Sequence, residues 1–296
     1  MRYLLLIVIA IIFVSLCTEI PYISEYIPQL FPIEQALGSL EVKTDSEIYF
    51  KVESIPKEVK SGRNVKIIVE LRNKANYTLK NIKLQAYDQC IFTGDNEITI
   101  EELKPSATNL TSWEWEAGVV TLPTDCSIKF RVNYTGDFSL FQDVIVLTES
   151  EYEMRQQAGT LHNIPIQTSS SSRPLKISVS FTEEQPLLDG TDVSMRINYE
   201  YTGNAFMDVD RGNIKINISE NLQPPKEQSD CKDYDITTSP LLLKEPLKFI
   251  NKRASPSTCT FTAETPPSQP MNIKTLSLTA TYKYILDNSL LIKVKP

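Results

Sequence analysis

Histidine, glycine and acidic residues are the groups of this chain that enzymatic chemistry would most need. The single histidine, His162, would have to serve any Ser-His-Asp triad, histidine-rich metal site or histidine general base. It lies in a polar stretch beside Asn163 and Pro165, which predicts a solvent-exposed side chain. The nine glycines each stand alone, so no glycine-rich phosphate-binding loop can be drawn. The sequence therefore predicts a protein that is not an enzyme and needs no cofactor.

Four of the five cysteines fall into two pairs with similar surroundings. Each half of the chain contains a turn with glycine, two alternating strands, a cysteine, a loop-rich interval and a further cysteine. The second cysteines of the two halves, Cys126 and Cys259, occupy equivalent positions. This repetition predicts one disulfide in each half, between Cys90 and Cys126 and between Cys231 and Cys259. The alternative, a zinc site, lacks CxxC spacing.

Two short motifs are candidates for ligand binding. Trp113 and Trp115 lie two residues apart, which places both indoles on one side of a predicted strand. Flat aromatic faces suit sugar rings, so carbohydrate stacking is one interpretation and packing in a core is the other. The segment from Asp208 to Asn213 is similar to a calcium loop. It lacks a third acidic or amide residue at alternate spacing before the glycine, and it lacks the glutamate that ends such a loop. A turn is therefore favoured there, and no metal site is predicted.

Asn-X-Ser/Thr triplets favour surface exposure of the segments that carry them. Such triplets are acceptors for N-glycosylation in secreted proteins. The candidate sites are Asn76, Asn109, Asn133 and Asn217.

The composition excludes one class of partner and favours a folded protein. The chain has 296 residues, a formal net charge of −7 and no cluster of lysine and arginine, which argues against binding to nucleic acid. A hydrophobic content of 41% is enough to bury two cores, and the length suits two domains of ordinary size.

Residues 1–17 consist of Arg2 followed by an almost uninterrupted apolar run, and the next basic residue is Lys43. This charge distribution puts the N-terminus in the cytoplasm and the rest of the chain outside the membrane. The run is short for a membrane-spanning helix. Three alternatives therefore remain open: residues 1–17 stay attached as a membrane anchor, they are a signal peptide cleaved before Thr18, or Cys17 is lipidated.

The remaining residues predict an all-β protein of two tandem immunoglobulin-like antiparallel β-sandwich domains after the N-terminal hydrophobic helix. Residues 18–40, rich in proline and aromatic residues, would form a stalk. Residues 41–150 and 175–296 show short alternating strands and would form the two sandwiches. Residues 151–174 would be a serine-rich linker, with a short helix that begins at a capping-box motif at Thr148.

The stretch from Ser61 to Asn73, followed by Ile82-Lys83-Leu84 and later by Leu103-Lys104-Pro105, resembles a known family of repeats. These are the CARDB-like, immunoglobulin-like repeats of archaeal S-layer-associated cell-surface proteins. The resemblance covers the first half well and the second half loosely, where Asn198-Tyr199 replaces the clearer asparagine that ends the strand. It implies a seven-stranded sandwich, a location at the cell surface, and an adhesive or scaffolding role without catalysis.

These features lead to three functional hypotheses. The first is a cell-surface protein, anchored at its N-terminus or secreted if the leader is cleaved, whose modules bind other envelope proteins or glycans. The second is a subunit of an extracellular filament or lattice, in which a strand such as Leu40 to Val52 completes the sheet of a neighbour. The third is a secreted hydrolase or sugar-binding accessory protein that would bind through Trp113 and Trp115.

Overall fold

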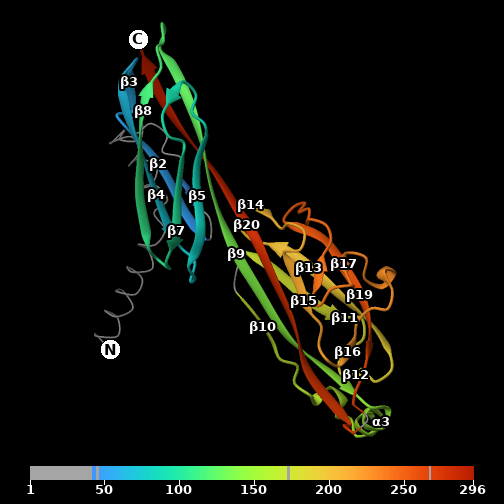
Figure 1. The fold of residues 1–296 in the computed structure, drawn as a ribbon. Coiled ribbons are helices and arrows are strands. Elements are labelled where there is room, and N and C mark those ends of the chain that lie inside the picture. The colour runs from blue at the N-terminus through green and yellow to red at the C-terminus, as the bar shows by residue number, and fades with distance from the viewer. Residues whose placement is uncertain (1–41, 45–46, 172–173, 267) are drawn as a thin grey trace, which may run out of the picture. The chain divides into compact units, whose positions relative to one another are not determined.

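The computed structural model describes residues 42–44, 47–171, 174–266 and 268–296 (Figure 1). These residues form mostly antiparallel β-sheets with one short α-helix, so the predicted all-β class is confirmed. The predicted anchor at 1–17 and the stalk at 18–40 lie outside the described residues.

The first sheet has five strands in the order β1-β2-β4-β8-β6. Its strands are β1 (Val42–Thr44), β2 (Ile48–Ile55), β4 (Asn64–Asn73), β8 (Thr108–Ala117) and β6 (Phe92–Thr93). Side chains of β2 alternate between the core and solvent, because successive residues of a strand point to opposite faces. The segment Ile48 to Val52, which the second functional hypothesis assigns to a neighbouring molecule, pairs here with β4 of its own chain.

The second sheet is the largest, with eleven strands, and it contains two unusually long ones. The main order is β17-β18-β15-β20-β9-β5-β7, and β10, β12, β14 and β3 pair to the side of β9 or β20. The long strands are β9 (Thr124–Leu147) and β20 (Met271–Lys295). The others are β3 (Glu58–Lys60), β5 (Leu79–Asp88), β7 (Glu97–Leu103), β10 (Thr168–Ser170), β12 (Leu187–Leu188), β14 (Phe206–Asp208), β15 (Ile214–Asn217), β17 (Tyr234–Asp235) and β18 (Leu241–Leu243).

The third sheet has four strands in the order β11-β13-β19-β16. Its strands are β11 (Leu175–Phe181), β13 (Asp192–Tyr201), β19 (Arg253–Ala263) and β16 (Leu222–Gln223). The helical segments are α3 (Glu149–Gln157), η1 (Leu161–Asn163) and η2 (Gln228–Cys231).

Strands β9 and β20 pair antiparallel along the whole of β9, from Thr124 opposite Val294 to Leu147 opposite Met271. Strand β5 extends the first half of β9, and β15 extends the part of β20 that pairs with its second half. We call the five-stranded sheet and the β5-β9-β20 region that it faces the first sheet pair. The four-stranded sheet and the β9-β20-β15 region that it faces are the second sheet pair. Figure 1 shows β9 in green and β20 in red side by side through both.

The last strand of the chain therefore returns to the first sheet pair. The end of β20 pairs with the start of β9 and, in parallel, with β3. The Asn288 side chain also donates a hydrogen bond of 3.0 Å to the Phe50 carbonyl of β2. This differs from the sequential division that the sequence predicts, in which residues 175–296 form the second sandwich alone.

Gly136 lies in the middle of β9, directly opposite Tyr282 of β20. The Tyr282 ring occupies the space that a Cβ atom at position 136 would need. The side chain is fully buried, so it has little room to move away. This position thus requires glycine because of close side-chain approach.

Replacement of Gly136 by alanine is expected to lower the free energy of unfolding by about 1–3 kcal/mol, the usual cost of overpacking a core. Urea denaturation would measure the loss. The matched control is the same substitution in a Tyr282→Ala background, where the added methyl group has space. Equal losses in the two backgrounds would contradict the steric explanation.

The predicted short helix is present as α3, and Gly159 follows it with a φ of 67°. The Thr148 side chain makes no capping hydrogen bond, so the predicted capping box does not form. Part of the predicted linker is a strand, because Thr168–Ser170 pairs with β9 as β10. The polar serines of this segment pair at a sheet edge through their backbone groups, which require no apolar side chain.

Candidate functional site

Trp113 and Trp115 both lie in the core of the first sheet pair. Trp113 is 4% exposed and Trp115 is fully buried, and their rings stack 5.5 Å apart. The Trp113 ring also lies 5.8 Å from that of Phe130 on β9, so it packs between the two sheets. The Trp115 indole donates a hydrogen bond of 2.7 Å to the Asp95 carbonyl. Core packing is thus the interpretation that the structure favours, since no broad indole face is left for a sugar ring.

The cysteines join as the repeat predicts, Cys90 to Cys126 and Cys231 to Cys259. The first bond connects the loop after β5 to the start of β9. The second connects η2 to β19, and both of its cysteines are fully buried. Each bond closes a long loop, with sequence separations of 36 and 28 residues, and so restricts the unfolded chain strongly.

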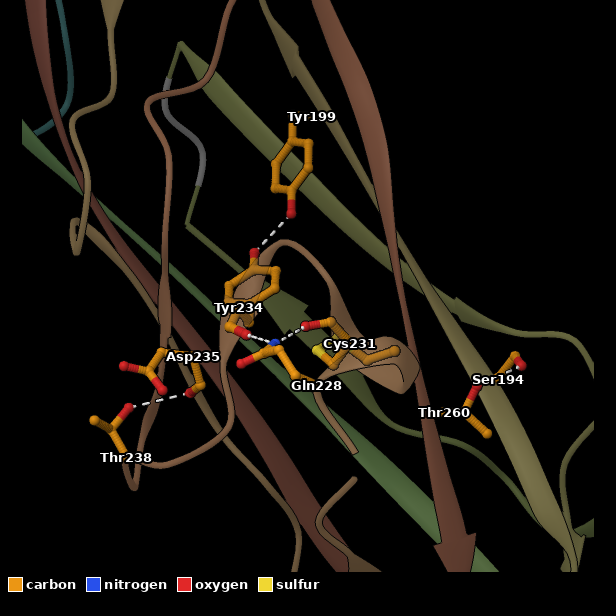
Figure 2. The surroundings of a disulfide bond; sticks show 9 residues. Ser194, Tyr199, Gln228, Cys231, Tyr234, Asp235, Thr238 and Thr260 are labelled. Atoms are coloured by element: carbon orange, nitrogen blue, oxygen red, sulfur yellow. Dashed lines mark hydrogen bonds between the residues drawn. A yellow bond between two sulfur atoms is a disulfide. The ribbon is translucent and has the colours of Figure 1, made fainter. Parts of the chain in front are cut away.

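Two tyrosines beside the second disulfide form a buried hydrogen bond. The hydroxyl groups of Tyr199 on β13 and Tyr234 on β17 lie 2.6 Å apart, and the bond joins the two sheets of the second sheet pair (Figure 2). The Gln228 side chain donates to the carbonyls of Cys231 and Tyr234, at 2.6 Å each, and fixes η2 next to them. No pattern in the sequence indicates this cluster, because tyrosines far apart in a sequence give no spacing signal.

Burial raises the pKa of both hydroxyl groups, since desolvation disfavours the phenolate. The pKa of Tyr199 rises to about 12, although its hydrogen bonds to Ser257 and Tyr234 act in the opposite direction. The pKa of Tyr234 is raised well above its ordinary value. Both groups are therefore neutral over the whole physiological range.

These shifts predict a loss of stability in alkali. The folded protein holds these two protons to higher pH than the unfolded chain, so their contribution is complete below pH 10 and falls as the pH rises to about 12. Denaturant titrations at a series of pH values should show this decline as a falling free energy of unfolding. The double variant Tyr199→Phe/Tyr234→Phe removes both groups and should decline less steeply. Parallel curves for the two proteins would contradict the assignment.

The four candidate glycosylation sites differ in accessibility. Asn76, in the turn after β4, and Asn217, on β15, are exposed, whereas Asn109 and Asn133 lie within strands and are half-buried. The Asn217 amide donates to Ser277, and Ser219 of the same triplet is buried. Asn76 is thus the site that the fold presents best to a modifying enzyme.

The remaining sequence candidates occupy the surface. His162 lies in η1 with its side chain 65% exposed, 4.0 Å from Glu184. Asp210 forms an ion pair with Lys283, and Gly212 has the φ of 74° that a turn requires, which agrees with the turn interpretation. No group of three or more potential metal ligands occurs among the described residues.

Two buried asparagines are a second feature that no pattern in the sequence indicates. The Asn73 amide donates to the Tyr77 and Leu103 carbonyls, at 2.7 and 2.8 Å, and closes the turn after β4. The Asn221 amide donates to the Val144 carbonyl of β9 at 2.7 Å. Both side chains are completely buried, and their amide groups are hydrogen-bonded to backbone carbonyls. They therefore hold neighbouring segments of the backbone together.

No protein-family model matches the chain, and no curated protein matches it at the significance required. Within the described part of the chain, no helix is both long enough and apolar enough to cross a membrane.

Proposed function

We propose that this chain is a non-catalytic cell-envelope protein that presents two immunoglobulin-like β-sandwich modules for adhesion or surface scaffolding. The observation that carries the proposal is the β9–β20 pair, which is common to both sheet pairs, each of which also contains a disulfide. Disulfides persist in oxidising compartments outside the cytoplasm, where unassisted stability is needed. The aromatic, asparagine and tyrosine clusters described above all support the fold rather than a cavity.

Adhesion is tested with the full chain, purified in mild detergent with its disulfides intact and coupled to beads. The beads are incubated with envelope fragments of the source cells, and the amount of envelope material that they retain is measured. The matched control is the same protein after reduction and alkylation, which has the same composition but lacks both disulfides. Retention of the native beads well above that of the control supports the proposal. Equal retention would show that the folded modules bind nothing in the envelope.

A second candidate is a filament or lattice subunit that assembles by strand addition. It is favoured by the outer edge of β8, where β6 pairs only with Glu116 and Ala117. Among the described residues, no strand pairs with this edge from Thr108 to Trp115. Leu110 lies on it with 70% of its side chain exposed. Unpaired edges of this kind are templates for another strand.

Electron microscopy of the full chain in mild detergent distinguishes the two candidates. Discrete particles support presented modules, whereas fibres or sheets support assembly. If fibres form, Leu110→Lys should prevent them, because a charge at an edge strand opposes pairing. The substitution is at an exposed site and should change the free energy of unfolding by less than about 0.5 kcal/mol. Fibres that persist in this variant would exclude β8 as the assembling edge.

A further inference from the structure

The loop of residues 118–123, between β8 and β9, exposes apolar side chains. Val119 is 86% exposed and Leu122 is 72% exposed, and Val119 is the most exposed large hydrophobic residue in the described part of the chain. Val120, between them, packs against the core. The loop therefore places one side chain inward and two outward.

The conformation of this loop is fixed by hydrogen bonds at its base. The Gly118 amide donates to the Ile91 carbonyl at 3.1 Å, and a Cβ atom on Gly118 would lie only 2.8 Å from that oxygen. The Val120 amide donates to the Ser61 hydroxyl at 3.0 Å. The Ser61 amide in turn donates to the Lys295 carbonyl at 2.8 Å. The backbone that carries Val119 and Leu122 is thus hydrogen-bonded to the loop after β5 and to Ser61, the residue after β3, which is itself bonded to β20.

Basic residues surround this base. Lys60 and Arg63 flank the Ser61-Gly62 turn, and the Ala117 amide just before the loop donates to the Arg63 carbonyl. Both cations are exposed, and neither forms an ion pair with another described residue. The side chains of residues 56–63, 116–125 and 293–296 include five cations and three carboxylates. The cations are Lys57, Lys60, Arg63, Lys293 and Lys295, and the carboxylates are Glu58, Glu116 and Asp125.

Two of the three carboxylates, Glu58 and Asp125, lie beside lysines of β20. Glu58 forms an ion pair with Lys295, and this lysine lowers the pKa of the Glu58 carboxyl. Asp125 lies directly opposite Lys293 in the β9–β20 register. The local excess is therefore positive, whereas the whole chain has a formal net charge of −7.

We infer that the loop of residues 118–123 is a binding site for an anionic lipid surface, into which Val119 and Leu122 insert while Lys60 and Arg63 contact the headgroups. Apolar side chains with adjacent cations are the combination that binds the interface of an anionic bilayer. The same basic excess disfavours a symmetric contact between the loops of two copies of the chain, because like charges would then face each other. The inference is independent of the adhesive role proposed above.

The test measures the fluorescence of a tryptophan introduced into the loop. The full chain, kept in mild detergent, is diluted into lipid vesicles. Leu122→Trp places an indole at the loop, and Leu110→Trp is the matched control, because Leu110 is similarly exposed but lies on the outer edge of β8. The two native indoles are buried and give a constant background. The vesicles are phosphatidylcholine alone, or phosphatidylcholine with phosphatidylglycerol.

Phosphatidylglycerol vesicles should shift the emission of the Leu122→Trp protein to shorter wavelength, and brominated lipids should quench it. Salt should reverse the effect, and the control protein should not respond. Adding Lys60→Glu and Arg63→Glu to the Leu122→Trp protein should weaken binding by at least about thirtyfold, given the contribution of each cation near a charged surface.

Three results would overturn the inference. The first is the absence of any shift, and the second is an equal shift in the Leu110→Trp control, which would indicate unspecific adsorption. The third is a shift that grows with protein concentration without lipid, which would identify a second copy of the chain as the occupant.

Discussion

Deletion of residues 288–296 is expected to unfold the first sheet pair, although these residues are the last of the chain. The deleted segment includes Ile292 and Val294, which are fully buried, and Asn288, which bonds to Phe50 of β2. It also removes the partner of β3. Each large buried apolar side chain contributes about 2–5 kcal/mol, so their joint loss is comparable to the whole stability of a domain.

Hydrogen exchange of β2 and β4 amides would measure the effect, with loss of protection expected in the truncated chain. A pair of point variants supplies the matched control. Ile292→Ala should lower the free energy of unfolding by about 3 kcal/mol, whereas Leu291→Ala, at a neighbouring position that is 55% exposed, should have little effect. Undiminished protection in the truncated chain would show that the first sheet pair closes without β20.

Replacement of both cysteines of either disulfide by serine is expected to lower the free energy of unfolding by about 4 kcal/mol. The physical reason is the greater conformational freedom of an unfolded chain in which loops spanning 36 or 28 residues are no longer closed. Guanidinium titration at neutral pH would measure it.

The loss should be slightly greater for Cys90 and Cys126, because they close the longer loop. Wild-type protein unfolded in the presence of reductant provides the control, and its midpoint should fall towards that of the variants. Variants as stable as the oxidised wild type would show that the two bonds contribute nothing to stability.

The sequence predicted the β class from period-two alternation, which is a local signal, and the cysteine pairing from the internal repeat. It did not predict which strands are neighbours. Gly136-Asp137 is a residue pair that favours a turn between two strands, and the structure instead continues β9 through it. Glycine and aspartate are typical of turns, and nothing local indicates that Tyr282 lies across the glycine.

Strand β20 likewise continues through a pair of residues that favours a turn. Asp287 and Asn288 separate two alternating segments and have turn-forming side chains. In the fold, Asp287 receives two hydrogen bonds from Arg131, at 2.7 and 2.8 Å, and Asn288 bonds to Phe50. These partners lie 156 and 238 residues away in the chain, so no local pattern contains them.

The return of β20 to the first sheet pair also determines the order of events during biosynthesis. A ribosome completes all four bonded cysteines before it reaches Met271, where β20 begins. Both disulfides can therefore form while β2, β3 and β9 still await their final neighbour. Closure of the first sheet pair is then a late step that joins the two ends of the described chain, and contacts of such long range form slowly. Until β20 has been synthesised, one edge of β9 stays unpaired over its whole length, and an unpaired strand edge in a partly folded chain favours aggregation.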